Sequence, residues 1–200
     1  MNVSKLIDLL NSRGFKASYF DDVDIAMEYI ASQVSNTSVG IGGSMTIAEL
    51  GIQPILESAG NKVFNHAINR SAEVLAGASL AEVYFLSANA ISMTGEIVNI
   101  DGRGNRIASS VFGPNRKKVF YVLGTNKVEE NLEKALFRAK NIAAPKNAKR
   151  LSMKTPCAIN ADKCYDCKSP DRICRATLIH EYPMFGVETH VVIIKGNYGF

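Results

Sequence analysis

Four cysteines form the most specific chemical pattern in this sequence. They have the spacing C-x6-C-x2-C-x6-C and are Cys157, Cys164, Cys167 and Cys174. Cysteine thiolates ligate zinc and iron–sulfur clusters, and this spacing matches neither the two-knuckle zinc pattern nor the usual ferredoxin runs. The sequence therefore predicts a bound metal at these residues and leaves open whether it is zinc or an iron–sulfur cluster.

The residues around the cysteines agree with a metal site. Basic residues are interleaved with them, namely Lys163, Lys168, Arg172 and Arg175. Their charge offsets the negative charge that several thiolates accumulate. The alternatives are reduced thiols without a metal and a redox dithiol at Cys164 and Cys167, although no thioredoxin-like context surrounds that pair.

The second pattern is a glycine turn, Gly42-Gly43-Ser44-Met45-Thr46, between an apolar stretch and a helical one. Glycines leave backbone N–H groups unobstructed, and the helix N-terminus that follows adds partial positive charge. Two hydroxyl groups add further donors. We therefore predict that the turn binds an anionic small molecule through Gly42, Gly43, Ser44 and Thr46, with a purely structural tight connection as the alternative. The spacing is that of neither the P-loop nor the dinucleotide-binding fingerprint.

Polar residues after two later apolar stretches are further candidates. Asn89, Glu96 and Asn99 cluster in residues 87–99, and Lys127 ends the stretch Gly124-Thr125-Asn126-Lys127. Glu96 is the candidate catalytic residue, because a partly buried carboxylate serves as a general base or a nucleophile; an exposed hairpin glutamate is the commoner case. Lys127 is a candidate anion ligand, with a solvated lysine at a helix start as the alternative.

The elements that must position these residues alternate between helix and strand. Helices are predicted at residues 4–14, 23–30, 46–50, 71–79 and 128–142, of which the last is the clearest amphipathic helix. Strands are predicted at residues 16–20, 38–42, 62–64, 83–86, 119–123 and 190–195. This alternation is typical of an α/β protein with a mostly parallel sheet flanked by helices.

Two segments interrupt the alternation. Residues 96–100 and 105–111 flank Asp101-Gly102-Arg103-Gly104 and are predicted to form an antiparallel hairpin that projects from the sheet. After Pro145 the helical pattern stops, and the basic run in residues 146–154 is interpreted as a solvated linker. A cysteine-rich, metal-binding segment follows within the same domain, at residues 152–178.

Composition limits the class of protein. The length of 200 residues fits one domain that folds without disulfides, and 46% apolar and 21% charged residues are globular values. The formal charge of +4 is small and dispersed, which disfavours nucleic acid as a partner. The first apolar stretch is too short and too charged for a signal peptide or a membrane span, so a cytoplasmic location is predicted. His66, His180 and His190 show no ligand spacing with one another and receive no role.

Several motifs in order resemble the lactate-utilization (LUD) domain family. They are the glycine turn at residues 42–46, the stretches at residues 87–91 and 95–102, and residues 124–127. The match covers nearly the whole chain, and the cysteine segment is similar to one carried by a short branch of that family. The resemblance implies an α/β fold of the ribose-5-phosphate isomerase, glucosamine-phosphate deaminase and CoA-transferase type.

The resemblance also implies roles by position. The glycine turn would bind an anionic group of a substrate or cofactor, and Lys127 would match a motif lysine. Asn89 and Glu96 would lie where relatives place polar or acidic residues. Isomerase-type relatives commonly have an aspartate near the position of Asn89, and an asparagine cannot ionise, which disfavours ordinary isomerase acid–base chemistry.

Two functions follow as hypotheses. The family name implies oxidation of L-lactate to pyruvate beside separate iron–sulfur subunits, so the first is an accessory or ligand-binding subunit with iron–sulfur oxidoreductase partners. The alternative is a stand-alone isomerase- or transferase-like enzyme acting on a phosphorylated or CoA-linked metabolite. The sequence carries no flavin or nicotinamide fingerprint, so the cysteines are the candidate electron carriers. A homo-oligomer is compatible with both hypotheses, and a membrane is not an expected partner.

Overall fold

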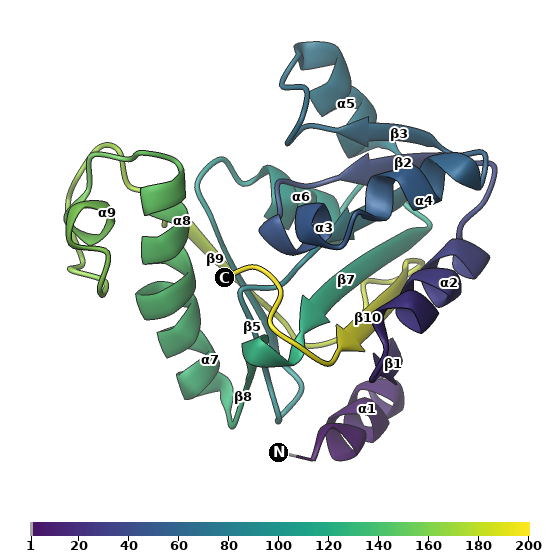
Figure 1. Ribbon diagram of the computed structural model, residues 1–200, viewed down its shortest axis with the longest axis horizontal. Coiled ribbons are helices and arrows are strands. Elements are labelled where there is room, and N and C mark those ends of the chain that lie inside the picture. Colours follow the sequence, from purple (N-terminus) through teal and green to yellow (C-terminus); the bar gives the residue numbers. More distant parts are fainter. Residues whose placement is uncertain (1) are drawn as a thin grey trace. The chain divides into compact units, whose positions relative to one another are not determined.

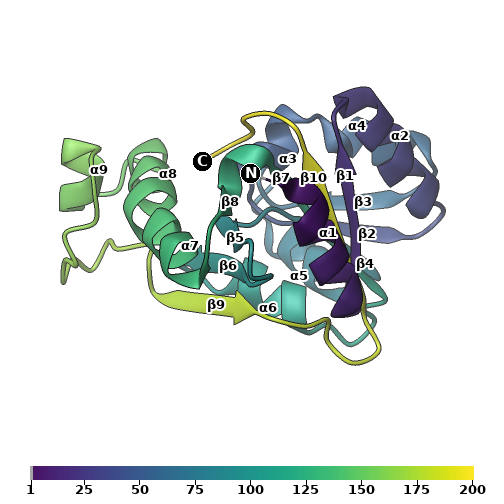
Figure 2. The same ribbon diagram turned by 90° about the horizontal axis from the view of Figure 1, so that it is seen from below.

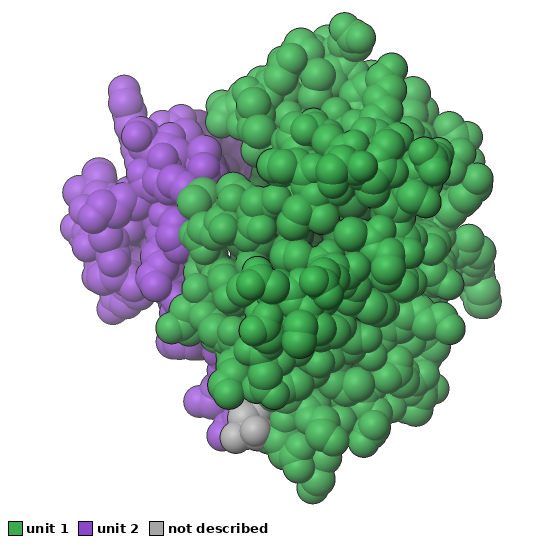
Figure 3. All heavy atoms as spheres, turned by 45° about the vertical axis from the view of Figure 1, so that its right-hand side comes forward, with its two compact units in different colours: residues 1–87, 108–126, 182–199 green, residues 88–107, 127–181, 200 purple. Residues whose placement is uncertain are grey.

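The chain divides into two compact units, which are coloured separately in Figure 3. The computed structural model describes residues 2–200. Unit 1 comprises the described residues up to Ser87 together with Ala108–Asn126 and Tyr182–Gly199. Unit 2 comprises Ala88–Ile107, Lys127–Glu181 and Phe200. The chain therefore passes from one unit to the other several times.

Unit 1 contains a six-stranded parallel sheet (Figure 1). Its strands are, in spatial order, β1 (Lys16–Phe20), β10 (Glu188–Ile194), β7 (Lys118–Gly124), β4 (Val83–Leu86), β2 (Ser38–Ile41) and β3 (Lys62–Asn65). Every strand predicted for the parallel sheet is present, and the α/β fold with a mostly parallel sheet flanked by helices is confirmed. The chain leaves β2 toward β3 on one side and leaves β4 toward β7 on the other, so the sheet has a topological switch point between β2 and β4.

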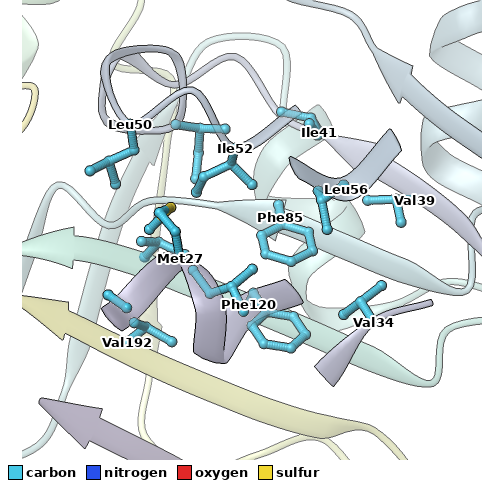
Figure 4. Packing of buried hydrophobic residues seen from close by; sticks show 14 of the residues in the cluster. Met27, Val34, Val39, Ile41, Leu50, Ile52, Leu56, Phe85, Phe120 and Val192 are labelled. Atoms are coloured by element: carbon cyan, nitrogen blue, oxygen red, sulfur yellow. The ribbon is translucent and has the colours of Figure 1, made fainter. Parts of the chain in front are cut away.

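Helices cover both faces of this sheet. The α-helices that lie wholly within the described part of unit 1 are α1 (Val3–Ser12), α2 (Val23–Gln33), α3 (Met45–Glu49), α4 (Ile52–Ser58) and α5 (Ala72–Leu80). The core cluster on one face joins apolar residues of α2, α3 and α4 to Val39, Phe85 and Phe120 of the sheet (Figure 4). Gly40 lies between two β2 residues of this cluster and faces the other way, toward the backbone of α5. The helix α5 therefore packs on the opposite face.

Unit 2 contains a four-stranded mixed sheet. Its strands are, in spatial order, β8 (Val128–Glu129), β5 (Ala90–Ser92), β6 (Ile97–Asp101) and β9 (Ala176–His180). The helix α7 (Leu132–Arg138) packs on one face of this sheet, where its Ala135 joins Val98 and Ile100 in a small apolar cluster (Figure 2). Among residues 2–200, no helix has the length and apolar composition needed to cross a membrane.

The predicted hairpin at residues 96–111 is wrong in its second half. Residues Asn105–Val111 form the helix α6, and β6 pairs antiparallel with β5 and β9 instead. The physical reason is the Asp101 carboxylate, which accepts a hydrogen bond from the Arg106 N–H at 2.9 Å and another from the Ile107 N–H at 3.3 Å. A carboxylate that accepts from the first N–H groups of a helix stabilises the helix start.

The helix predicted at residues 128–142 begins later and runs past Pro145. Residues 128–129 are strand β8, and Asn131 caps α7 by accepting from the Lys134 N–H at 2.9 Å. A π-helical turn, Ala139–Ala143, leads from α7 directly into α8 (Ala144–Arg150). Proline has no N–H to donate, and a widened turn just before it accommodates the lost bond. Lys146, Lys149 and Arg150 therefore lie on a helix and not in a linker.

Candidate functional site

The glycine turn connects β2 to α3 at the carboxyl edge of the sheet of unit 1, next to the switch point. The Gly42 N–H donates to the Phe85 carbonyl and the Gly43 N–H donates to His66 Nε2, both at 2.9 Å. The Ser44 hydroxyl caps α3 by accepting from the Ile47 N–H at 3.3 Å. An anion at this turn would therefore compete with His66 for the Gly43 donor.

His66 is the residue at this turn that the sequence analysis missed. It directly follows β3, and the parallel pairing of Ile41 with Asn65 brings the residues after β2 and β3 to the same edge. When neutral, an imidazole that accepts through Nε2 carries its proton on Nδ1. The spacing of the three histidines along the sequence does not indicate this contact. Only the adjacency of β2 and β3 in the sheet would have indicated it.

Residues 196–199 lie against α3 and the end of β7. The buried Thr46 hydroxyl donates to the Tyr198 carbonyl at 3.0 Å, so this predicted anion ligand is bound by the protein's own backbone. The Gly199 N–H donates to Glu49 Oε2 at 2.6 Å, and the Tyr198 N–H donates to Asn126 Oδ1 at 3.4 Å. Tyr198 also lines a groove of about 580 Å³ beside α2, together with Met27.

Asn89 lies in unit 2, at the start of β5, where both its backbone and its side chain bind β6. Its Oδ1 accepts from the Ile100 N–H at 2.7 Å, and its own N–H approaches Asn99 Oδ1 at 3.2 Å. Arg138 Nη1 donates to the Asn89 carbonyl at 2.5 Å. The asparagine therefore holds two strands of the unit 2 sheet together.

Glu96 lies in the turn between β5 and β6. Its carboxylate accepts hydrogen bonds from the Thr94 hydroxyl, at 2.6 Å, and from the Ser92 hydroxyl. Its N–H donates to the Ser92 hydroxyl oxygen at 3.0 Å. The candidate catalytic carboxylate thus stabilises the turn in which it lies, and Gly95 gives that turn its positive φ of 94°.

Lys127 ends a short 3-10 helix, Thr125–Lys127, and its side chain is buried, with 3% of its surface exposed. The alternative of a solvated lysine is therefore wrong. Burying an ammonium group is costly unless it is paired. Lys127, Asn89 and Glu96 all belong to unit 2, whereas the glycine turn belongs to unit 1.

The four cysteines are half-buried free thiols in unit 2. Cys157 lies on α9 (Pro156–Asn160), and the other three follow in the irregular segment before β9. Within residues 2–200, no three side chains of histidine, cysteine, aspartate or glutamate are grouped so that they could hold a metal ion.

Each cysteine has a polar or charged neighbour. The Cys164 Sγ accepts from the Asp166 N–H at 3.3 Å, and the Thr155 hydroxyl lies 3.3 Å from the Cys157 Sγ. The Arg172 guanidinium lies beside Cys174 and Cys167, and the hydrogen bond to Cys174 is the main cause that raises the pKa of Arg172 above its usual value. Each of the four thiols therefore lies beside a hydrogen-bond donor or a cation.

Two comparisons relate the chain to known proteins. A family model described as LUD domain matches residues 3–194. The chain is also similar in structure to a DUF162 family protein from Deinococcus radiodurans, with 14% sequence identity, a TM-score of 0.55, and coverage of 97% of this chain and 96% of that one. At this identity the likeness concerns the fold alone. A comparison with curated proteins gave no match.

Proposed function

The chain belongs to the LUD domain family, and from this premise we propose that it is an accessory, ligand-binding subunit of a system that oxidises L-lactate to pyruvate. The family is associated with lactate utilization. The partners in this proposal are separate iron–sulfur oxidoreductase subunits, which carry out the electron transfer from lactate. The chain itself binds an anionic small molecule and does not transform it.

The observation that carries this proposal is the set of hydrogen bonds made by the carboxylate of the candidate catalytic residue, Glu96. The Glu96 carboxylate accepts from the hydroxyls of Ser92 and Thr94 within one turn. Asn89 stands where isomerase-type relatives commonly have an acid, and its side-chain oxygen accepts from the Ile100 N–H. Both bonds to Glu96 reach Oε2 and hold the carboxylate in the turn where it lies. The contacts of both residues support structural roles in the unit 2 sheet, and therefore a binding function.

The glycine turn is the ligand site in this proposal. The N–H of Gly43 points to a neutral acceptor, His66 Nε2, which a carboxylate or phosphate oxygen can replace. A charged oxygen accepts a stronger hydrogen bond than an imidazole nitrogen does. Lactate, pyruvate and phosphorylated or CoA-linked metabolites all carry such an oxygen.

The second part of the proposal is a metal at Cys157, Cys164, Cys167 and Cys174. Four thiols within one short segment have the donor chemistry of a zinc or iron–sulfur site. No three of them are grouped for a metal in the described residues, so binding would have to draw the segment together around the metal. The N–H that donates to the Cys164 Sγ and the cation beside Cys174 are the kinds of contact that stabilise ligating thiolates. A cluster there would carry electrons, and a zinc ion would hold the segment in shape.

The experiment for the subunit role is affinity purification of the tagged chain from lactate-grown cells, paired with deletion of its gene. We expect oxidoreductase subunits to co-purify and growth on lactate to slow while growth on glucose is unchanged. Unimpaired growth on lactate together with no recovered oxidoreductase subunit would contradict the role. Turnover of a sugar phosphate or an acyl-CoA by the isolated chain would also contradict it, in favour of a stand-alone enzyme.

The experiment for the metal is anaerobic purification followed by elemental analysis and a visible spectrum. Iron with the broad absorption of a cluster assigns electron transfer to the cysteines, and zinc assigns a structural role. Four titratable thiols and neither metal would refute the site. Anaerobic handling is required because exposed thiolates oxidise readily.

A further inference from the structure

We propose that residues 196–199, which we call the strap, occupy part of the ligand site and that an anionic ligand must displace them to reach Thr46. This inference rests on the ligand-binding role of the glycine turn in the proposed function. The strap follows β10 and lies against α3 and the end of β7 (Figure 1). These elements and the glycine turn all belong to unit 1.

The group for which the strap and a ligand compete is the Thr46 hydroxyl. Thr46 is a predicted anion ligand, and it is buried, with 1% of its surface exposed. Its hydroxyl donates to the Tyr198 carbonyl of the strap at 3.0 Å. A hydroxyl has a single hydrogen to donate, so it serves either the strap or an oxygen of the ligand. A charged oxygen is the stronger acceptor of the two.

The end of β7 binds the strap through two polar side chains. The Thr125 hydroxyl donates to the Gly196 carbonyl at 3.3 Å and accepts from the Gly196 N–H at 3.1 Å. Asn126 Nδ2 donates to the Gly199 carbonyl, and its Oδ1 accepts from the Tyr198 N–H, both at 3.4 Å. Three of these four distances exceed the usual range of roughly 2.7–3.2 Å, so the bonds are weak. Weak bonds suit a segment that a ligand displaces.

The strap has a fixed base and a glycine near each end. The Lys195 N–H donates to the Phe20 carbonyl at 2.9 Å, and the Lys195 ammonium group lies 3.0 Å from Asp21 Oδ1. The chain is therefore held to the end of β1 up to this residue. Gly196 and Gly199 have positive φ angles of 132° and 64°. Since glycine rotates into other backbone conformations at little cost, the strap can leave while β10 stays in the sheet.

Two contacts hold the strap in place when no ligand is bound. The Tyr198 side chain packs against the core cluster that α2, α3 and α4 form with the sheet. The Gly199 N–H donates to Glu49 Oε2 at 2.6 Å, and a hydrogen bond to a charged acceptor is stronger than a neutral one. Neither the Tyr198 ring nor Glu49 is among the predicted ligand-binding groups. Replacing either one should therefore loosen the strap and leave the ligand site intact.

Two variants loosen the strap, and the chain offers a control for each. Tyr198→Ala removes the ring, and Asn197→Ala is its control, because Asn197 is an exposed residue of the same strap. Glu49→Gln leaves the Gly199 N–H with a weaker, neutral acceptor. Glu57→Gln is its control, because it removes the same unit charge from an exposed residue of α4. A difference within the second pair reports the contact with the strap and not the net charge.

The first measurement is calorimetric titration of the full-length chain with L-lactate and, separately, with inorganic phosphate. We expect Tyr198→Ala and Glu49→Gln to bind at least one probe about 3- to 10-fold more tightly than the wild type. A closed strap lowers the apparent affinity by the fraction of open molecules, and one typical hydrogen bond changes such a fraction by a factor of this size. Asn197→Ala and Glu57→Gln should bind as the wild type does.

The second measurement is hydrogen exchange of the strap amides in the wild type, with and without a saturating probe. The amides of Gly196, Tyr198 and Gly199 should exchange faster when the probe is bound, and those of β10 should not change. Slower exchange of the strap amides would overturn the inference, because the strap would then close over the ligand instead of leaving it.

The outcomes separate this inference from the proposed function. Wild-type affinity in both loosened variants, with strap amides that exchange faster than in the wild type, overturns the role of the strap and leaves the binding function standing. Failure of the wild type and of both loosened variants to bind either probe contradicts the binding function of the glycine turn, and this inference with it. If Tyr198→Ala does not fold, equal affinities of Glu49→Gln and Glu57→Gln overturn the inference.

Discussion

The Glu96 carboxylate and the hydroxyls of Ser92 and Thr94 form a closed set of hydrogen bonds within one turn. Each hydroxyl donates to the carboxylate, and the Glu96 N–H returns to the Ser92 oxygen. Hydrogen bonds that involve a charged group contribute more to stability than neutral ones do. At the scale of single residues, the measurable effect of Glu96 is therefore its contribution to the stability of the turn between β5 and β6.

We expect Glu96→Gln to lower the free energy of unfolding by about 1 kcal/mol, because a charged acceptor is replaced by a neutral amide oxygen, which accepts weaker hydrogen bonds from the two turn hydroxyls. Denaturant unfolding measures this change. Glu130→Gln, which removes the same charge from an exposed residue, is the control and should change stability by less than about 0.5 kcal/mol. Equal stabilities of the two variants would show that the turn does not depend on the carboxylate.

At the scale of whole elements, two glycines allow α5 to pack closely on the sheet. A Cβ atom on Gly40 of β2 would lie 2.3 Å from the Ala78 carbonyl oxygen and 2.8 Å from Tyr84 Cδ2. A Cβ atom on Gly77 of α5 would lie 2.3 Å from Phe64 Cδ1. Helix and sheet therefore approach each other more closely than side chains of any size would allow.

Gly40→Ala should therefore destabilise the chain by about 1–3 kcal/mol, because α5 must move away from the sheet. Thermal and denaturant unfolding measure this loss. Gly43→Ala serves as the control for the same added methyl group, since its Cβ atom would lie 3.5 Å from the nearest group, His66 Nε2. A Gly40→Ala variant as stable as Gly43→Ala would mean that the close approach is dispensable.

The same scale explains which parts of the fold could be predicted from the sequence. Strands β2, β4 and β7 are short apolar runs buried on both faces, which is the pattern of a parallel sheet. The helix α6 was missed because the seven residues Asn105–Val111 carry no clear period and depend on a carboxylate in the preceding strand, Asp101. The continuation of the helix through Pro145 depends on a π-helical turn that propensity does not indicate.

The candidate site was predictable only where the signal is local. The glycine turn was identified because glycines, a serine and a helix start are contiguous in the chain. The contact of His66 with Gly43 depends on the order of β2 and β3, and the contact of Thr46 with Tyr198 joins residues from opposite parts of the sequence. Such contacts follow from strand order and tertiary packing, which one sequence does not specify.

At the scale of the molecule, the sheet of unit 1 carries a titratable group in its interior. His190 of β10 is buried and stacked on Phe120, with ring centroids 4.2 Å apart. Its Nε2 lies 2.7 Å from Glu188 Oε1 and its Nδ1 lies 3.3 Å from the Tyr29 hydroxyl. Burial is the main cause that lowers the pKa of His190, and the positive charges of Lys118 and Lys16 lower it further, against the opposing effect of Glu188.

The free energy of unfolding should therefore decrease when the pH is lowered. Above the ordinary histidine pKa of about 6.5 the folded and unfolded chains both hold this residue neutral; below it the unfolded chain binds a proton that the folded chain does not. The free energy of unfolding should decrease as the pH falls from about 6.5 toward the lowered pKa. The pKa of Glu188 is also lowered, chiefly by its hydrogen bond with His190, and its protonation at still lower pH acts in the same direction.

Unfolding curves at a series of pH values, for the wild type and for His190→Gln, measure this dependence. The variant should show a smaller loss of stability between about pH 7.5 and about pH 5.5, because it has no proton to bind there. The comparison uses the slope with pH, so a uniformly less stable variant still decides the question. Parallel curves for the two proteins would exclude His190 as the source.

The position of β10 between β1 and β7 also governs how fast this chain reaches its native state. β1 lies at the edge of the sheet, and its pairing with β10 joins residues such as Lys16 and His190 across nearly the whole described sequence. Pairings between such distant residues close large loops and are the slow steps of folding. During synthesis β1 is made long before β10. Its backbone N–H and C=O groups therefore stay unpaired, and open to association with other chains, until β10 has been synthesised.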